Sequence, residues 1–264
     1  GMITSGGTLT GTVTNQATGT LALTNGASTG GVVFNQGGIV TVTGAATVGS
    51  VFSANNAAST TINAGANLTT TRFDNNGTAN LQVNGTLTGP LMNTTTGATV
   101  NVASSGTVTG TISNVGTMGS AGDLQGAVTN TGALTLLAGS TLGSTLNNNP
   151  TGTVNVTGNT SVVGNVTNTS ASATAVTVAA GTTLTTPELD NDAGTVALVG
   201  ALSGNLSNAA GATVNVTTGT GSVSGTTNNF GSITSGGTLT GAVTNQSTGT
   251  LALTNGASTG GVVF

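Results

Sequence analysis

Residues 8–28 read TLTGTVTNQATGTLALTNGAS, and two kinds of segment alternate in this stretch. Within each segment the apolar side chains lie an even number of residues apart, at Leu9 and Val13 and at Leu21 and Leu23. A period of two residues is typical of a β-strand with one buried face, and threonine and valine both favour such surfaces. The intervening QATG and TNGAS have turn compositions. The stretch therefore predicts short strands joined by tight corners.

The local context of Val13 recurs along the whole chain. We call the residue equivalent to Val13 the anchor of its unit; the next anchors are Val33, Phe52, Phe73, Leu91, Ile112, Val128, Leu146, Val166, Leu189, Leu206 and Thr227, and Val243 begins the cycle again. This gives twelve units in 230 residues, or about nineteen residues in each. Self-similarity at such a period predicts a solenoid.

Asparagine recurs two positions after the anchor. The column comprises Asn15, Asn35, Asn75, Asn93, Asn114, Asn130, Asn148, Asn168, Asn191, Asn208, Asn229 and Asn245, and its one exception is Ala54. At a corner, asparagine tolerates a left-handed backbone, and its amide both donates and accepts hydrogen bonds. Copies stacked about 4.8 Å apart are expected to form a side-chain ladder, as amides do in cross-β stacks. We interpret these residues as structural.

A longer repeat lies above the nineteen-residue unit. Residues 231–264 repeat residues 1–34 with 31 of 34 positions identical, and the differences are Met2/Ser232, Thr12/Ala242 and Ala17/Ser247. Weaker matches, such as GATVNV at 97–102 and at 211–216, group six units into a block of about 115 residues. We therefore predict a single continuous array over residues 1–264.

One unit has too few apolar residues to bury a core alone, whereas stacked units pair each strand with its copies above and below. The sequence thus predicts an all-β fold, a β-solenoid of about twelve rungs per 230 residues with the asparagine ladder at a corner. Proline cannot donate in a central ladder, so Pro90, Pro150 and Pro187 are expected at corners. The five phenylalanines are expected in the core.

Composition excludes several functions. The net charge is −4, and a single arginine cannot neutralise a row of phosphates, so nucleic-acid binding is not expected. No run of about 18 apolar residues occurs, so no membrane span is expected in this segment. General acid–base catalysis needs groups that titrate near neutral pH, and the chain has neither histidine nor cysteine. We expect no enzyme and no cofactor.

The few charged residues suggest two candidate sites. Glu188, Asp190 and Asp192 stand at alternate positions of one segment, so on a strand their side chains share a face. Carboxylate oxygens are ligands that Ca²⁺ takes, so this face is a candidate calcium site. A solvated polar face is the alternative interpretation. Arg72 and Asp74 occupy the repeat position of Glu188 and Asp190, six rungs away. These four residues are a candidate lateral contact between neighbouring filaments.

Threonine pairs raise a further alternative. A flat ice-binding face needs T-x-T at one position on successive rungs. Threonines stand five and three residues before the anchor at Thr8/Thr10, Thr86/Thr88, Thr107/Thr109 and Thr238/Thr240, and the other units interrupt this array. Counted from the anchor, the face is patchy.

The units L-T-G-x-V-x-N…G-T-L-x-L resemble, over the whole chain, the rungs of bacterial surface β-solenoid adhesins, such as autotransporter passenger domains and filamentous-haemagglutinin-like exoproteins. The resemblance implies a secreted or surface-displayed fibre in which the solenoid is a stalk, scaffold or adhesive shaft. The near-identity at 230 residues departs from typical passengers, whose rungs drift, and indicates a more regular filament.

The expected function is therefore a non-catalytic structural segment of an extracellular or cell-surface filament that self-associates end to end. The alternatives are an adhesin shaft that binds host or carbohydrate surfaces, and an ice-binding solenoid. Twelve rungs about 4.8 Å apart predict an axial repeat of about 58 Å and a pseudo-repeat of about 29 Å.

Overall fold

The computed structural model describes residues 1–254 and 256–261 of the chain. All the secondary structure in these residues is β, as predicted, and the chain divides into two compact units, Gly1–Val128 and Thr129–Phe264. We describe each unit by itself. The last residues of the 231–264 repeat, 262–264, lie outside the described residues.

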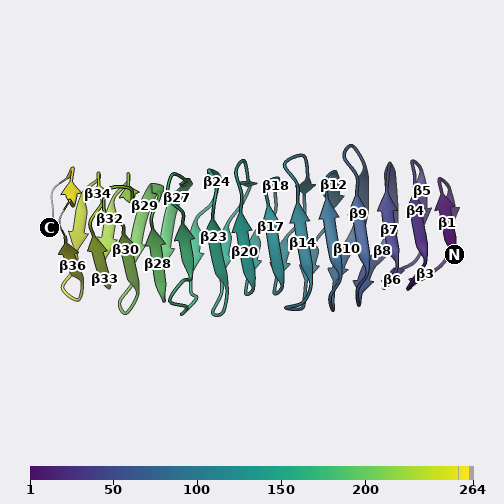
Figure 1. Ribbon diagram of the computed structural model, residues 1–264, viewed down its shortest axis with the longest axis horizontal. Helices are drawn as coiled ribbons and strands as arrows, with labels where there is room; N and C mark the ends of the chain where they lie inside the picture. The colour runs from purple at the N-terminus through teal and green to yellow at the C-terminus, as the bar shows by residue number, and fades with distance from the viewer. Residues whose placement is uncertain (255, 262–264) are drawn as a thin grey trace. The chain divides into compact units, whose positions relative to one another are not determined.

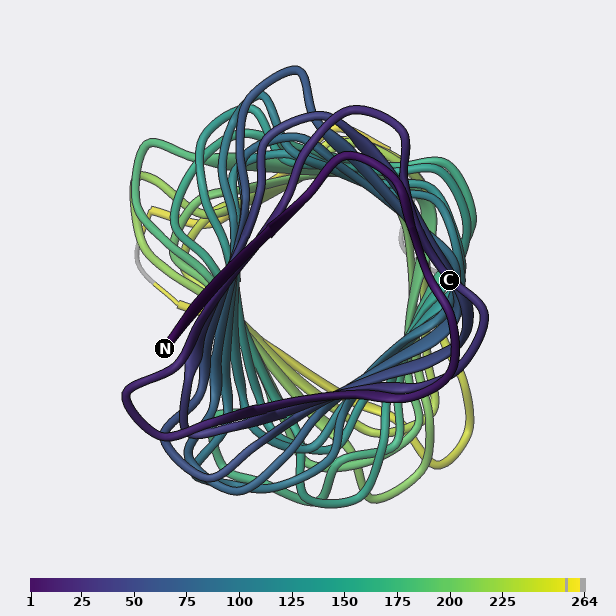
Figure 2. The ribbon, with the colours of Figure 1, turned by 90° about the vertical axis from the view of Figure 1, so that its right-hand side faces the viewer.

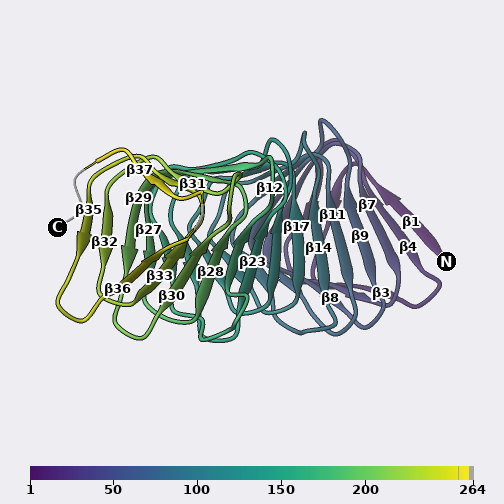
Figure 3. The ribbon, with the colours of Figure 1, turned by 60° about the vertical axis from the view of Figure 1, so that its left-hand side comes forward.

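Each turn of the chain contributes strands to three faces, which we call A, B and C in chain order. Face A of the first unit is a parallel sheet of seven strands (Figure 3): β1 (Met2–Ser5), β4 (Thr20–Leu23), β7 (Ile39–Val42), β9 (Ser59–Ile62), β11 (Asn80–Val83), β14 (Thr99–Val102) and β17 (Thr117–Ser120).

Faces B and C of the first unit have shorter strands. Face B holds β2 (Thr8–Leu9), β5 (Ala27–Thr29), β12 (Thr86–Thr88), β15 (Thr107–Val108) and β18 (Asp123–Leu124). Face C holds β3 (Val13–Gln16), β6 (Val33–Gln36), β13 (Leu91–Asn93) and β16 (Ile112–Asn114), and the long strands β8 (Ala45–Asn55) and β10 (Asn67–Asn75) run over both faces. β19 (Val128–Asn130) contains the sequence boundary between the units.

The second unit repeats this plan (Figure 1). Face A holds β20 (Ala133–Leu136), β23 (Thr153–Val156), β26 (Val176–Val178), β28 (Thr195–Leu198), β30 (Thr213–Val216), β33 (Ser232–Ser235) and β36 (Thr250–Leu253). Face B holds β21 (Thr141–Leu142), β24 (Thr160–Val162), β31 (Ser222–Val223), β34 (Thr238–Leu239) and β37 (Ser258–Thr259). Face C holds β22 (Leu146–Asn148), β25 (Val166–Asn168), β32 (Thr227–Asn229) and β35 (Val243–Asn245), while β27 (Thr183–Asn191) and β29 (Ala201–Asn208) cover both.

Neighbouring turns stack in parallel register, and the register confirms the predicted anchors. In the first unit the anchors pair in the order Val13, Val33, Phe52, Phe73, Leu91 and Ile112. In the second unit the order is Leu146, Val166, Leu189, Leu206, Thr227 and Val243. Twelve face A strands, β1 to β30, precede Gly231, so the predicted twelve turns per 230 residues are confirmed.

The core lies inside the turns. Along most strands burial alternates, as in β4 and β11, because successive side chains point to opposite sides of a strand. Viewed along the stacking direction, the turns within each unit follow a similar closed outline (Figure 2), and the inward aliphatic side chains fill it. Each unit therefore obtains from stacking the core that no single turn can supply.

The phenylalanines do not all fill the core. Phe52 and Phe73 are fully buried and stack with ring centroids 4.7 Å apart. Phe34 points outward from β6, and Phe230 is exposed at the corner after β32, so the prediction is wrong for these two. Both follow a buried residue by one position, which turns them to the other side of the chain. Phe264 lies outside the described residues.

Two of the three prolines lie at corners. Pro90 separates β12 from β13, and Pro150 follows β22. Pro187 instead lies inside β27, where the pairing with β29 shifts register between Thr185 and Glu188. Because the ladder is already irregular at that bend, a residue without an amide donor is tolerated there.

Candidate functional site

The asparagine column forms the predicted ladder. The amide Nδ2 of one turn donates to Oδ1 of the next in every pair along Asn130, Asn148, Asn168, Asn191, Asn208, Asn229 and Asn245, at 2.7–2.9 Å. In the first unit the same kind of bond joins Asn15 to Asn35. It also joins Asn75 to Asn93 and Asn93 to Asn114. All these donors point toward the turn that follows in sequence.

Ladder amides also bond to the backbone. Nδ2 of Asn148, for example, donates to the carbonyls of Gly152 and Ala175 as well as to Oδ1 of Asn168. Asn148 is fully buried, and a buried amide without partners costs about 1–3 kcal/mol. The ladder therefore ties the end of face C to the start of face A in the next turn.

The predicted backbone reason for asparagine is wrong. Among the described residues, the only ones other than glycine with positive φ are Thr18 and Asn56, and neither belongs to the ladder. The ladder residues lie within or at the end of face C strands and point inward. The side-chain amide, rather than the backbone conformation, is therefore the reason for asparagine at these positions.

The ladder is interrupted at one turn. Ala54 pairs with Asn35 on one side and with Asn75 on the other, so Oδ1 of Asn75 is buried without a hydrogen-bond partner. Nδ2 of Asn35 keeps the backbone bond of the other ladder residues, to the carbonyl of Ser59 at 3.1 Å, and donates to Oγ1 of Thr60 at 3.4 Å where the next ladder amide is missing. A buried hydroxyl on β9, the face A strand that follows Ala54, thus accepts in place of the missing ladder amide.

Face B carries a column of hydroxyl groups in the first unit. Five successive turns place a threonine or serine in one register position, namely Thr8, Ser28, Thr47, Thr69 and Thr88. Oγ of Ser28 donates to Oγ1 of Thr8 at 3.1 Å. Such a column presents hydroxyl groups at the turn spacing of about 4.8 Å.

This column differs from the T-x-T array predicted by counting from the anchor. Thr88 shares the column of Thr8, whereas Thr86 lies opposite Asn67 and Thr107. The distance in sequence to the anchor shortens from five residues at Thr8 to three at Thr88 because the corner between faces B and C changes length. Pairing of strands, rather than distance from the anchor, therefore identifies the continuous column.

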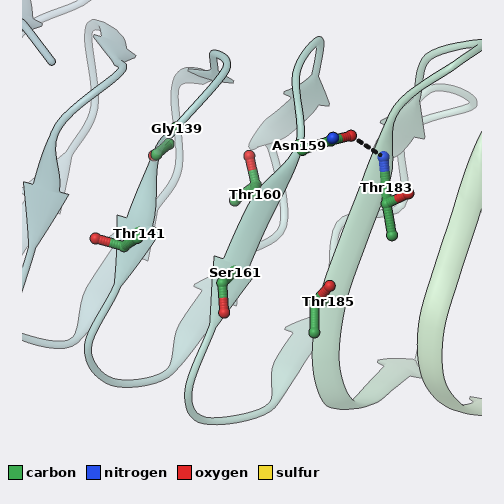
Figure 4. Close-up of a pocket in the computed structure, with 8 residues that line it drawn as sticks. Gly139, Thr141, Asn159, Thr160, Ser161, Thr183 and Thr185 are labelled. Atoms are coloured by element: carbon green, nitrogen blue, oxygen red, sulfur yellow. Dashed lines mark hydrogen bonds between the residues drawn. The ribbon is translucent and has the colours of Figure 1, made fainter.

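In the second unit face B carries a surface hollow of about 280 Å³. Three successive turns line it with Gly139, Ser140, Thr141, Asn159, Thr160, Ser161, Thr183 and Thr185 (Figure 4). Thr141, Ser161 and Thr185 pair in register, and the Thr183 amide donates to Oδ1 of Asn159 at 2.9 Å. The lining is neutral and offers hydroxyl and amide groups only, so it suits a polar, uncharged ligand.

The three acidic residues of the calcium prediction lie on β27 and just beyond its end. Glu188 and Asp190 are partly exposed on β27, and Asp192 is exposed beyond its end. Partial desolvation raises the pKa of the Asp192 carboxyl, and the charge of Asp190 raises it further. Within residues 1–254 and 256–261 no group of three His, Cys, Asp or Glu side chains is placed to hold a metal ion, so the calcium interpretation gains no support.

Arg72 forms an ion pair within its own strand. Its Nη2 and Nε atoms lie 2.7 and 3.1 Å from Oδ2 of Asp74 on β10, and this hydrogen bond and charge raise the pKa of the arginine. Glu188 and Asp190 occupy the equivalent places on β27. Contact between the two positions in neighbouring filaments stays a prediction.

Comparison with known proteins finds no protein-family model, no curated protein and no solved structure that matches the chain. The described part of the structure has no helix able to cross a lipid bilayer.

Proposed function

We propose that this chain is a non-catalytic structural segment of a protein filament, displayed outside the cell or on its surface, in which copies associate end to end. The observation that carries the proposal is the in-register stacking of the same residue type from turn to turn, with the asparagine ladder as its most regular element. Because each turn makes the same contacts with the next, further turns can be added along the stacking direction with the same set of contacts.

The distribution of charge supports this function. The six charged side chains lie on faces B and C or at corners, and the strands of face A contain none. Like charges directly opposite one another destabilise paired strands. An uncharged face A avoids this penalty however many copies are stacked.

Electron cryo-microscopy of the native material tests the proposal. Long fibres should give layer lines at about 4.8 Å and, from twelve turns, at about 58 Å. Discrete short rods without the long repeat would contradict a structural filament.

The hydroxyl column supports a second candidate, an adhesive shaft that binds a carbohydrate surface. The column of Thr8, Ser28, Thr47, Thr69 and Thr88 and the neutral hollow of Figure 4 both offer hydroxyl groups without charge. The test is a pull-down on insoluble polysaccharides with wild type and Thr47→Lys, together with an ice-recrystallisation assay.

Retention on a polysaccharide that Thr47→Lys abolishes would favour the shaft. Activity in the ice assay alone, again lost in Thr47→Lys, would favour ice as the ligand. A variant that behaves as wild type in both assays would contradict a binding role for this column.

A further inference from the structure

Asparagine is followed directly by glycine at several corners, and this pair of residues has a chemistry of its own. The pairs are Asn25-Gly26, Asn76-Gly77, Asn84-Gly85 and Asn255-Gly256. The backbone nitrogen of the glycine can attack the side-chain carbon Cγ of the asparagine, because glycine has no Cβ to obstruct the approach. The first three pairs lie among the described residues, and Asn255 lies outside them.

The fold protects two of these three glycine amides. The amide of Gly26 donates to the carbonyl of Ala45 at 2.9 Å, and the amide of Gly85 donates to the carbonyl of Ile62 at 3.1 Å. The nitrogen must leave this bond and lose its proton before it attacks, so an amide that holds an acceptor reacts slowly. Gly85 is also buried, away from the solvent that would take up the proton.

The third glycine amide is free. Gly77 is exposed at the corner between β10 and β11, where its φ is 63°. Within the described part of the chain its amide has no hydrogen-bond acceptor, and the turn is closed instead by the Ala79 amide, which donates to the carbonyl of Asn76 at 3.0 Å. The Gly77 nitrogen is therefore open to solvent, and no hydrogen bond opposes its attack.

A hydroxyl group of the next turn polarises the side-chain amide beside this nitrogen. Oγ1 of Thr94 donates to Oδ1 of Asn76 and, at 3.4 Å, to the carbonyl of Asn75. A donor on Oδ1 draws electron density from Cγ and stabilises the oxyanion that forms when a nucleophile adds. Asn84 has a similar donor in Nε2 of Gln82, at 2.8 Å, but its glycine amide is bonded. Among the three described pairs, Asn76-Gly77 alone combines a free nucleophile with a polarised carbonyl.

We propose that Asn76 is a site of spontaneous modification, at which the chain converts a neutral amide to a carboxylate without an enzyme. The nitrogen of Gly77 forms a bond to Cγ of Asn76, and the bond from Cγ to Nδ2 breaks. Nδ2 leaves as ammonia with the proton that the Gly77 nitrogen gives up. Water then opens the cyclic imide at either of its carbonyls and leaves aspartate or isoaspartate. No electrons are transferred, and water is the co-reactant.

The modification changes the charge and the length of this corner. It makes the net charge of −4 one unit more negative, and it places a carboxylate two residues from Asp74, which already pairs with Arg72. Isoaspartate also adds a methylene group to the main chain between face C and face A. Old material is therefore more acidic than new material at this corner. This inference does not depend on the proposed filament.

Incubation of the folded full chain in mildly alkaline buffer, followed by peptide mapping with mass spectrometry, tests the site. Aspartate and isoaspartate both raise the mass of the peptide, and chromatography separates the two products. Asn76 should be converted about tenfold faster than Asn25 and Asn84, because they lack the free glycine amide. In urea the three asparagines should react at similar rates, since the unfolded chain keeps only their shared Asn-Gly sequence.

Thr94→Val tests the polarising hydroxyl. Loss of this donor should slow the conversion of Asn76 about fivefold, which is the effect of one net hydrogen bond. Thr95→Val is the matched control, because Oγ1 of Thr95 donates to the carbonyl of Gly77 at 2.7 Å and does not bond to the amide of Asn76. This control should react at a rate close to that of the wild type. Circular dichroism checks that both variants are folded.

Other outcomes overturn the proposal. Conversion of Asn25 or Asn84 as fast as Asn76 in the folded chain would show that the free Gly77 amide does not select the site. An Asn76 that reacts in urea and stays intact in the folded chain would show that the fold protects it. Equal slowing by Thr94→Val and Thr95→Val would reject activation by the Thr94 hydroxyl.

Discussion

Oδ1 of Asn75 lies against Ala54 of the preceding turn and has no hydrogen-bond partner. In the ladder bonds described above, this atom accepts from the asparagine one turn earlier, as Oδ1 of Asn93 does from Asn75. One methyl group in place of one amide thus leaves a buried acceptor unsatisfied in an otherwise regular column.

Ala54→Asn should complete the ladder. The new amide would accept from Asn35 and donate to Asn75, so we expect the free energy of unfolding to rise by about 1 kcal/mol. Urea denaturation measures this change. Asn93→Ala is the matched opposite: it removes one amide from an intact part of the ladder, and it should lower the free energy of unfolding.

Thr60 makes the prediction sharper. Its hydroxyl accepts from Asn35 where Ala54 supplies no amide, so Thr60→Val should destabilise the wild type. In the Ala54→Asn background the same substitution should be neutral or stabilising. Additive effects in this double-mutant cycle would show that the two positions are not coupled.

Thr227→Val should stabilise the second unit. Thr227 occupies an anchor position between Leu206 and Val243, and its Oγ1 is buried without a partner. Valine keeps the shape and removes the unsatisfied hydroxyl, so the free energy of unfolding should rise by about 1 kcal/mol or more. Thr167→Val, which changes an outward residue of β25, is the control and should have little effect. An unchanged or lowered stability of Thr227→Val would argue for a role of this hydroxyl in the fold.

Stability should depend little on pH. The chain has no histidine, cysteine, tyrosine or lysine, which are the side chains whose ordinary pKa lies between about 6 and about 11. The raised pKa of Asp192 means that the folded state binds the proton more tightly than the unfolded state. Its contribution is therefore complete below the ordinary pKa of 3.8 and is lost as the pH rises through the raised folded value. Asp192→Asn should remove this small decline in melting temperature, and a decline that persists would assign it to another carboxylate.

Arg72→Ala should weaken lateral bundling if Arg72 and Asp74 contact Glu188 and Asp190 of a neighbouring filament. Low salt should strengthen bundling in the wild type and leave the variant unaffected, because exposed charges are screened. Turbidity and negative-stain microscopy measure bundle width. Bundles of the same width in both proteins would exclude this contact, and Asp123→Asn controls for a change of net charge elsewhere.

The anchors and the asparagine column could be predicted from the sequence because the asparagine follows its anchor by the same two positions in each turn that carries it. Face B could not be predicted in the same way, since the corner between Thr69 and Phe73 is shorter than the corner between Thr8 and Val13. A one-dimensional count does not show how much chain a corner contains. The repeat position of Arg72 predicts partners in a neighbouring filament, whereas residues two apart share a face of a strand, and the structure pairs Arg72 with Asp74.

In every ladder bond described above the N–H points toward the later turn and the accepting oxygen toward the earlier one. Aligned amide dipoles sum, as peptide units do along an α-helix. Here the partial positive pole of each run lies at its C-terminal end, opposite in sign to a helix. Inside each unit the ladder thus gives the chain a permanent dipole made by neutral side chains. This dipole requires neither salt bridges nor protonation.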